Sequence, residues 1–193
     1  MQEQSTADRI LAEARRLVMA RGYNGFSYAD IADAVGIRKA SIHHHFAAKS
    51  DLVRAVVEQA RDGFRGHAGQ MRDANIGPRD QLRAYVAYWE RCILDDTDAF
   101  CVAAVLAAEL PALPEDVATA VQAHFRDSTG WLARILDDGV AEGTVRLSGA
   151  PASEADAFLS AIYGAMLSAR AFRDVGRFLD TAALLLSRVM VLR

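Results

Sequence analysis

Three consecutive histidines, His43, His44 and His45, lie in the segment "IRKASIHHHF" at residues 37–46 and could in principle bind a metal ion. Neighbouring residues of a helix point about 100° apart, so three successive imidazoles fan away from one another. Helical metal ligands recur instead every three or four residues, and no second ligand cluster lies near this run. The sequence therefore predicts no metal site and no cofactor, which leaves the histidines for contact with a partner.

Ser41 and His44 have the spacing of a nucleophile and its base on one side of a helix. A catalytic serine also needs an acid that orients the histidine and a loop that binds the oxyanion. No acid lies near this pair in the sequence, and the chain has no glycine-rich elbow, phosphate-binding loop or HExxH motif. We expect no catalytic residues and no enzyme; a small helical enzyme is the remote alternative.

The two cysteines, Cys92 and Cys101, are too few for a disulfide framework and favour a reducing cytoplasm. The N-terminal residues show no apolar stretch typical of a secretory signal. The longest apolar run, residues 99–108, is about half of the ~20 residues that a membrane-spanning helix needs. We therefore expect a cytoplasmic protein that has no membrane partner.

Charge is distributed unevenly along a chain whose net charge is −3. Residues 1–55 contain eight basic against six acidic side chains, whereas the remainder is acidic. No acid lies between Ala34 and Ser50, and both lysines of the chain, Lys39 and Lys49, fall there beside Arg38. A basic spot on an acidic body is typical of a protein with one surface that contacts an anionic partner.

Helical periodicity extends over nearly the whole chain, which predicts an all-α fold. Serine caps open helices over residues 6–21 and 28–35, and Gly36 ends the second of these. A short helix over 39–45 follows, with Ile42 facing inward. Two short helices joined by a tight glycine turn form a helix-turn-helix, whose second helix fits the DNA major groove.

The segment "GYNGFSYADIADAVGIRKASIHHHFAAKSDLV" at residues 22–53 resembles the DNA-binding signature of the TetR family of bacterial transcriptional regulators. The family pattern has a Gly-aromatic pair, a Ser or Thr helix start, an Ile-Ala pair, a glycine turn, and an aromatic or His-rich helix end followed by Lys. One position departs, since His43 stands where the family usually has Tyr, and the phenol hydroxyl is lost. The matching residues are Gly22, Tyr23, Ser27, Ile31, Ala32, Val35, Gly36, Ile37, His45, Phe46, Lys49 and Leu52.

The resemblance implies double-stranded operator DNA as a partner, with one group of residues on the phosphates and a second group facing the groove. The phosphate group would be Ser27, Tyr28, His43, His45 and Lys49. An Arg or Lys contact to guanine would be worth about 1–3 kcal/mol of discrimination. The groove-facing group would be Arg38, Lys39, Ala40, Ser41 and His44.

The resemblance also implies a division into domains. A helix-turn-helix domain would occupy residues 1–50, followed by a linking helix over about 49–74 and a helical effector-binding and dimerisation domain over 75–193. About nine helices are expected in all, with Pro78 opening the first helix of the second domain and Ser153 capping a later one. The expected helices of that domain span 78–95, 98–110, 114–142, 153–172 and 175–191.

The last two helices are expected to pair with a second copy of the chain, giving a homodimer that reads a palindromic operator. Half-sites would then lie about 34–36 Å apart. The competing interpretation is an internal helix pair of a monomer. The expected interface residues are Ala157, Ala161, Gly164, Ala165, Ser168, Leu179, Leu186, Val189 and Met190.

A pocket for a small-molecule effector is expected among the helices of the second domain, because ligand pockets combine apolar walls with a few polar groups. Each of the aromatic candidates could equally belong to the core. The candidate lining is Tyr85, Tyr88, Trp89, Cys92, Phe100, Cys101, Phe125, Trp131 and Tyr163.

These features predict a homodimeric repressor that a small molecule releases from its operator. An alternative is a redox- or electrophile-sensing repressor, because the segment around Cys101 is similar to a subset of the family with such members. A thiol near a helix N-terminus is favoured as thiolate. The neighbouring Val102, Val105 and Leu106 instead suggest a buried and unreactive thiol.

Overall fold

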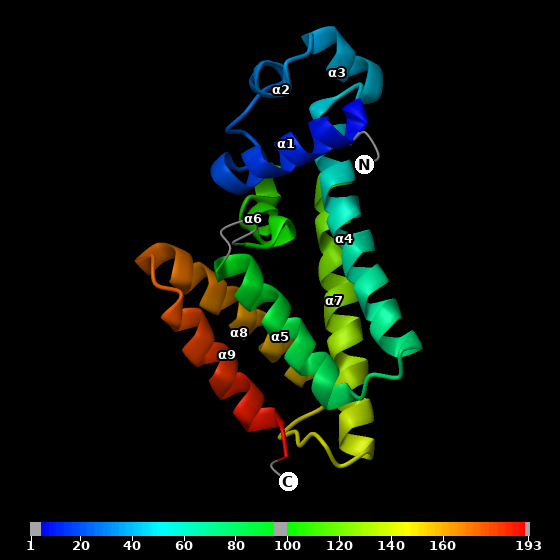
Figure 1. Cartoon of the computed structure of the whole chain (residues 1–193), viewed down its shortest axis with the longest axis vertical. Helices are drawn as coiled ribbons and strands as arrows, with labels where there is room; N and C mark the ends of the chain where they lie inside the picture. The colour runs from blue at the N-terminus through cyan, green and yellow to red at the C-terminus, as the bar shows by residue number, and fades with distance from the viewer. Residues whose placement is uncertain (1–4, 95–99, 192–193) are drawn as a thin grey trace. The chain divides into compact units, whose positions relative to one another are not determined.

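The computed structural model describes residues 5–94 and 100–191, and its regular elements in these ranges are helices (Figure 1). The predicted all-α class is therefore confirmed. None of the described helices combines the length and apolarity that a bilayer crossing requires. The elements are α1 (Thr6–Arg21), α2 (Tyr28–Val35), α3 (Lys39–His45), α4 (Lys49–Asp73), α5 (Pro78–Leu94), α6 (Val102–Ala108), the 3-10 helix η1 (Leu110–Ala112), α7 (Glu115–Ala141), α8 (Pro151–Phe172) and α9 (Gly176–Val189).

The chain forms two compact units. Unit 1 comprises residues 1–63 and 102–125, and unit 2 comprises residues 64–101 and 126–193. Two of the three boundaries fall inside α4 and α7, and the third lies directly before α6. The segment 102–125, which the sequence had suggested for the second domain, thus packs with the N-terminal helices.

The first two helices begin at capping boxes, as the sequence predicts. Ser5 with Asp8 and Ser27 with Asp30 each exchange side-chain and backbone hydrogen bonds, which satisfies N–H groups that have no partner inside the helix. Gly36 ends α2 in the left-handed conformation with φ 75°, and its N–H donates to a carbonyl of the last turn at 2.9 Å. This turn is what separates α2 from α3.

An apolar core joins all the helices of unit 1, including α6 and the first part of α7. Fully burying one such side chain stabilises the fold by about 1.5–3 kcal/mol. Because α6 contributes to this core, it belongs to the same folded unit as the helix-turn-helix. Fully buried members are Ile10, Val18, Ile31, Ile42, Leu52, Val56, Leu106 and Val117.

Glu109, directly after α6, holds the chain where α1 ends. The Tyr23 N–H donates a bifurcated hydrogen bond to the Glu109 carboxylate, at 3.0 Å to Oε2 and 3.2 Å to Oε1. Gly22 has φ 73°, and a Cβ there would lie 1.9 Å from the Glu109 Oε1. The glycine is therefore required both by its backbone conformation and by the close approach of the carboxylate.

In unit 2, α8 lies beside α9, and α9 also contacts α5 (Figure 1). The residues around the end of α9 pair with the loop that follows α7. The Arg146 N–H donates to the Val189 carbonyl at 2.8 Å, and the Val191 N–H donates to the Thr144 carbonyl at 3.0 Å. These bonds fix the C-terminal end of α9 within unit 2.

The start of α8 differs from the prediction. The helix begins at Pro151, which suits the first position of a helix because its ring presets φ and it lacks the N–H that would go unpaired there. The Glu154 carboxylate then accepts hydrogen bonds from the Ser148 and Gly149 N–H groups at 3.0 and 2.8 Å. The predicted cap at Ser153 is wrong, because Pro151 starts the helix two residues earlier.

Replacing Gly22 by alanine is expected to lower the free energy of unfolding by about 1–3 kcal/mol, since a positive φ is strained for alanine. The new Cβ would also displace the Glu109 carboxylate from the Tyr23 N–H. The matched control is Gly66→Ala in α4, where a Cβ meets nothing within 4 Å. This control should gain about 0.5–1 kcal/mol. Urea unfolding followed by circular dichroism measures both, and equal stability of G22A and the native chain would contradict the account.

Candidate functional site

The outer side of α3 carries most of the side chains predicted to meet the groove. Ile42 is fully buried and Phe46 is partly buried, so these two residues fix α3 against the rest of unit 1. Ser41 is also partly buried. The exposed residues are Arg38, Lys39, Ala40, His43, His44 and His45.

Arg38 and Lys39 are the cations of this surface. Neither side chain makes an ion pair or a hydrogen bond with the part of the chain that the structure describes. Their donors are therefore available to an incoming partner. A cation that neutralises a DNA phosphate adds affinity for any sequence, whereas Arg or Lys bonded to guanine adds discrimination.

Tyr28 is placed differently from the exposed phosphate donor that the resemblance implies. It is 6 % exposed, and its hydroxyl donates to the Phe46 carbonyl at 3.0 Å. The His43 ring packs edge-on against it, with centroids 4.8 Å apart. Burial, followed by the nearby Asp51 charge, raises the pKa of Tyr28 to about 12, so the hydroxyl stays protonated and keeps its bond. The Tyr28 hydroxyl thus positions the end of α3, and a phosphate contact through its N–H stays a prediction.

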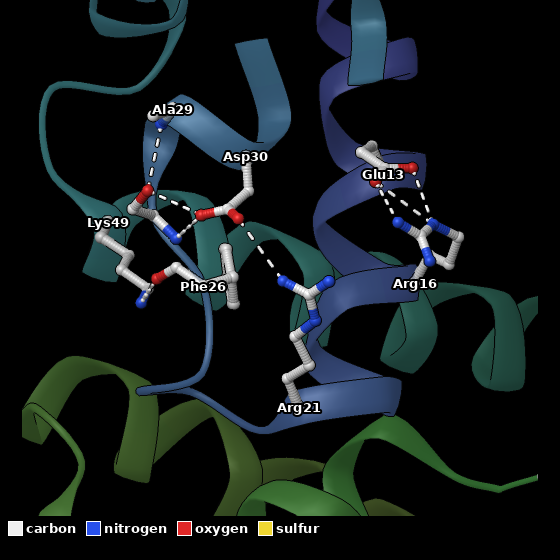
Figure 2. A network of polar contacts seen from close by, with 8 residues as sticks. Glu13, Arg16, Arg21, Phe26, Ala29, Asp30 and Lys49 are labelled. Atoms are coloured by element: carbon white, nitrogen blue, oxygen red, sulfur yellow. Dashed lines mark hydrogen bonds and ion pairs between the residues drawn. The ribbon is translucent and has the colours of Figure 1, made fainter. Parts of the chain in front are cut away.

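Ser27 is the N-cap of α2. Its partners Ala29 and Asp30 belong to the polar network that Figure 2 shows. Its hydroxyl donates to the Asp30 Oδ2 at 2.7 Å and accepts from the Ala29 N–H at 3.2 Å. These bonds to Ser27 lower the pKa of Asp30, and the Arg21 Nη1 lies 3.4 Å from the Asp30 Oδ1. Ser27 therefore caps the helix beside a negative charge that disfavours an approaching phosphate. Its predicted phosphate contact stays untested.

Lys49 is partly buried, and its ammonium donates to the Phe26 carbonyl (Figure 2). The Nζ lies 4.1 Å from the centroid of the Phe26 ring and 4.9 Å from that of Tyr23. Burial lowers the pKa of Lys49. The ammonium therefore stabilises the loop before α2 by a hydrogen bond. Its predicted phosphate contact would require it to leave the Phe26 carbonyl.

Four of the aromatic residues predicted for a pocket form a cluster in unit 2. The ring centroids of Tyr85 and Trp131 lie 5.5 Å apart, and those of Trp89 and Tyr163 lie 6.4 Å apart. Burial raises the pKa of both Tyr85 and Tyr163. The four rings thus pack on one another.

The other predicted pocket residues lie in several environments. Phe125 packs against the core of unit 1, whereas Tyr88 is exposed on α5. Phe100 is buried in unit 2, and Cys92 is partly buried there. The predicted set is therefore not one continuous pocket wall.

Cys101 is buried, with 3 % of its surface exposed. The Tyr163 hydroxyl donates to its Sγ at 3.5 Å, and neither Cys101 nor Cys92 is in a disulfide among the residues that the structure describes. A thiol shielded from solvent reacts slowly, because oxidants and alkylating reagents cannot reach it. The burial of Cys101 favours the interpretation of an unreactive core thiol.

A cavity of about 530 Å³ lies in unit 2 among α4, α5 and α7. Small-molecule sites commonly have volumes of about 300–1,000 Å³. Phe64, Trp131 and Ile135 supply apolar lining, and the Phe64 and Trp131 rings meet edge to face at 5.4 Å. Charged side chains line the rest: Arg65, Arg72, Arg126, Arg134, Asp127 and Asp138. We call this cavity the arginine cleft.

Trp131 is the one predicted pocket residue that lines the arginine cleft. The arginines were not predicted, although their spacing places them on shared helix sides. Arg126 and Arg134 are eight residues apart with Gly130 midway, and Arg65 and Arg72 are seven apart. This spacing places the arginines on a common helix side, but it does not distinguish a cleft from a solvated helix face.

The outer sides of α8 and α9 carry exposed apolar side chains. Leu167, Phe172 and Leu184 are 59, 63 and 50 % exposed. None of the three is among the interface residues predicted from the sequence, although Leu167 lies one turn after Gly164. Of the predicted interface residues, Ala157 and Gly164 are exposed; Ala161, Ser168, Leu179 and Leu186 are partly exposed; and Ala165, Val189 and Met190 are buried within the chain.

An exposed two-turn helix, set by a glycine turn and carrying cations on its outer side, defines a helix-turn-helix DNA-binding protein. Residues 10–56 match the family model described as "Bacterial regulatory proteins, tetR family", and residues 78–183 match "Tetracyclin repressor-like, C-terminal domain". The chain belongs to the TetR family of bacterial transcriptional regulators.

Individual relatives agree with this assignment. A solved structure of a TetR-family transcriptional regulator from Agrobacterium tumefaciens is 47 % identical, covers 97 % of this chain and 99 % of its own, and superposes with a TM-score of 0.93. The repressor NemR of Escherichia coli is 24 % identical over 174 residues, 89 % of this chain and 87 % of NemR. The repressor KstR2 of Mycolicibacterium smegmatis is 27 % identical over 145 residues, 75 % of this chain and 70 % of KstR2. The protein is a DNA-binding transcriptional regulator, as the sequence predicts, and not an enzyme.

Lys39→Ala is expected to weaken DNA binding and to reduce the slope of log affinity against log salt by about 1 for each bound copy of the chain, because each copy loses one phosphate contact. Arg83→Ala is the matched control, since Arg83 is an exposed cation of α5 that pairs with Asp80. It should bind as the native chain does. Fluorescence anisotropy on the duplex upstream of the protein's own gene, between about 50 and 200 mM salt, gives both slopes. An unchanged slope for K39A would contradict the placement of Lys39 on DNA.

Cys101 is expected to resist a thiol reagent in the folded protein, whereas the less buried Cys92 should react. Cys92→Ser and Cys101→Ser variants assign the labelled thiol by mass, and denaturant should expose both. Treatment with peroxide should leave DNA affinity unchanged. Labelling of native Cys101 together with loss of DNA affinity after peroxide would favour the redox-sensing alternative.

Proposed function

We propose that the protein is a homodimeric repressor that binds a palindromic operator and leaves it when a small molecule binds in unit 2. The observation that carries the dimer is the exposed apolar surface on α8 and α9. Both NemR and KstR2 are named as transcriptional repressors, which supports repression over activation. Operator DNA lies in the bacterial cytoplasm, so we expect the protein there.

The helix α3, which we call the recognition helix, has seven residues and reaches few base pairs. A second copy of the chain is therefore needed for specific binding. Two copies related by a two-fold axis present the same surface to each other, and an operator read by them is palindromic. The exposed face of α8 combines small residues, Ala157 and Gly164, with the larger Leu167. Small residues let helices approach closely, while leucines on α8 and α9 supply apolar area to bury.

The arginine cleft is the candidate site for the effector, because its volume suits a small molecule and its lining combines aromatic rings with charged groups. A ligand shifts the population toward the form that it binds better. If that form holds the recognition helices at a spacing that does not fit the operator, DNA is released. A coupling free energy of about 1–3 kcal/mol would change operator occupancy severalfold or more.

Leu184→Glu is expected to convert the dimer to a monomer, because a carboxylate in a buried apolar interface loses its hydration without a partner. Operator affinity should fall at least about tenfold, since only one half-site is then held at a time. Leu94→Glu is the matched control, as Leu94 is a similarly exposed leucine, 57 % exposed, on α5. Sedimentation velocity and operator anisotropy measure the two effects, and circular dichroism checks the fold. A native chain that sediments as a monomer, or an L184E variant that remains a dimer, would contradict the proposal.

A further inference from the structure

We infer that the arginine cleft binds an anion carried on a flat apolar body, such as an aromatic carboxylate, sulfonate or phosphate ester. That such a ligand is the effector rests on the proposed function. Binding of the ligand to the cleft does not, because it depends only on residues of unit 2.

On α7, two arginines flank a glycine. Arg126, Gly130 and Arg134 recur every four residues and therefore lie along one side of the helix. A Cβ on Gly130 would meet nothing within 4 Å, so the glycine leaves open space between the two guanidinium groups. Neither arginine forms an ion pair among the residues that the structure describes, although Asp138 lies one turn beyond Arg134. The Arg134 Nε makes a long bond of 3.4 Å to the Gly130 carbonyl.

The facing side of α4 repeats this arrangement. Arg65 and Arg72 are seven residues apart and are separated by the small residues Ala68 and Gly69, which also line the cleft. The Arg65 Nε lies 2.8 Å from the Asp127 Oδ2, so one of the four arginines is neutralised across the cleft. The Arg72 Nε lies 3.6 Å from an oxygen of Asp73, in a pair that is mostly exposed to solvent.

Charge sets the sign of the ligand. Four arginines and two aspartates, Asp127 and Asp138, line the cleft, and Asp73 outside the lining pairs with Arg72, which leaves one positive charge in excess within a chain of net charge −3. A cationic ligand would be repelled, and a neutral ligand would gain no charge-assisted hydrogen bond from these solvent-exposed arginines. The planar guanidinium fork pairs in two-bond geometry with carboxylate, sulfonate and phosphate oxygens.

The aromatic lining sets the shape of the ligand. The Phe64 and Trp131 rings pack edge to face with their centroids 5.4 Å apart, and Ile135 extends the apolar surface. Trp131 is buried, so it forms a fixed wall. A ligand that places a flat apolar body here and its anionic group between the arginines would satisfy both parts of the lining.

The test uses two probes of nearly the same shape: the anionic 8-anilinonaphthalene-1-sulfonate and its neutral counterpart N-phenyl-1-naphthylamine. The chain has two tryptophans, so Trp89→Phe leaves Trp131 as the reporter within the cleft. The sulfonate should quench Trp131 saturably, and the neutral probe should bind at least about tenfold more weakly, as loss of a charged hydrogen bond predicts.

Arg126→Glu and Arg134→Glu should each weaken binding of the sulfonate at least about tenfold, whereas Arg83→Glu, the same charge change outside the cleft, should not. Gly130→Leu should weaken binding by filling the space without changing charge, and Gly66→Leu, which also meets open space, serves as its control. Equal affinity of the two probes, or sulfonate binding unaffected by R126E, R134E and G130L, would overturn the inference. Operator affinity is measured separately: binding at the cleft that leaves DNA affinity unchanged would refute the effector role while the ligand class stands.

Discussion

The burial of Ile42 is the contact on which the DNA-binding surface depends. A helix of seven residues has no stability of its own in water, because nucleation costs more than so few hydrogen bonds return. Its place is set by Ile42 in the core of unit 1 and by the Tyr28 hydroxyl bonded to the Phe46 carbonyl. Arg38 and Lys39 can face a partner only because the opposite side of the helix is fixed in this way.

The same core extends beyond the helix-turn-helix. Leu106 of α6 and Val117 of α7 are as fully buried in it as Ile42, and Glu109 holds the backbone at Tyr23. α7 then continues along the chain to Arg126 and Arg134, which line the arginine cleft. One continuous helix therefore contributes both to the unit that carries the recognition helix and to the proposed ligand site, which gives the effector a structural element to act on.

Local patterns were enough to predict much of the fold. The capping boxes at Ser5 and Ser27 and the left-handed Gly36 follow from residue type, and they define the helix-turn-helix. The predicted cap at Ser153 was wrong because a Ser-x-x-Asp pattern can also occur inside a helix that Pro151 has already started.

Contacts between residues distant in the sequence were not predicted. Tyr28 and Lys49 were expected to be free for phosphate, but their partners, the Phe46 and Phe26 carbonyls, lie 18 and 23 residues away. Such contacts depend on tertiary packing, which periodicity does not reveal. The arginine cleft went unpredicted for the same reason, since arginines at helical spacing usually mark a solvated helix face.

Selection of bound duplexes from a random-sequence DNA pool tests most directly the claim that two copies of α3 read an operator. The native chain should enrich an inverted repeat whose half-sites lie about 34–36 Å apart. The double variant Arg38→Ala, Lys39→Ala should not enrich it. Enrichment of no motif, or of a motif that R38A/K39A recovers equally well, would contradict this claim.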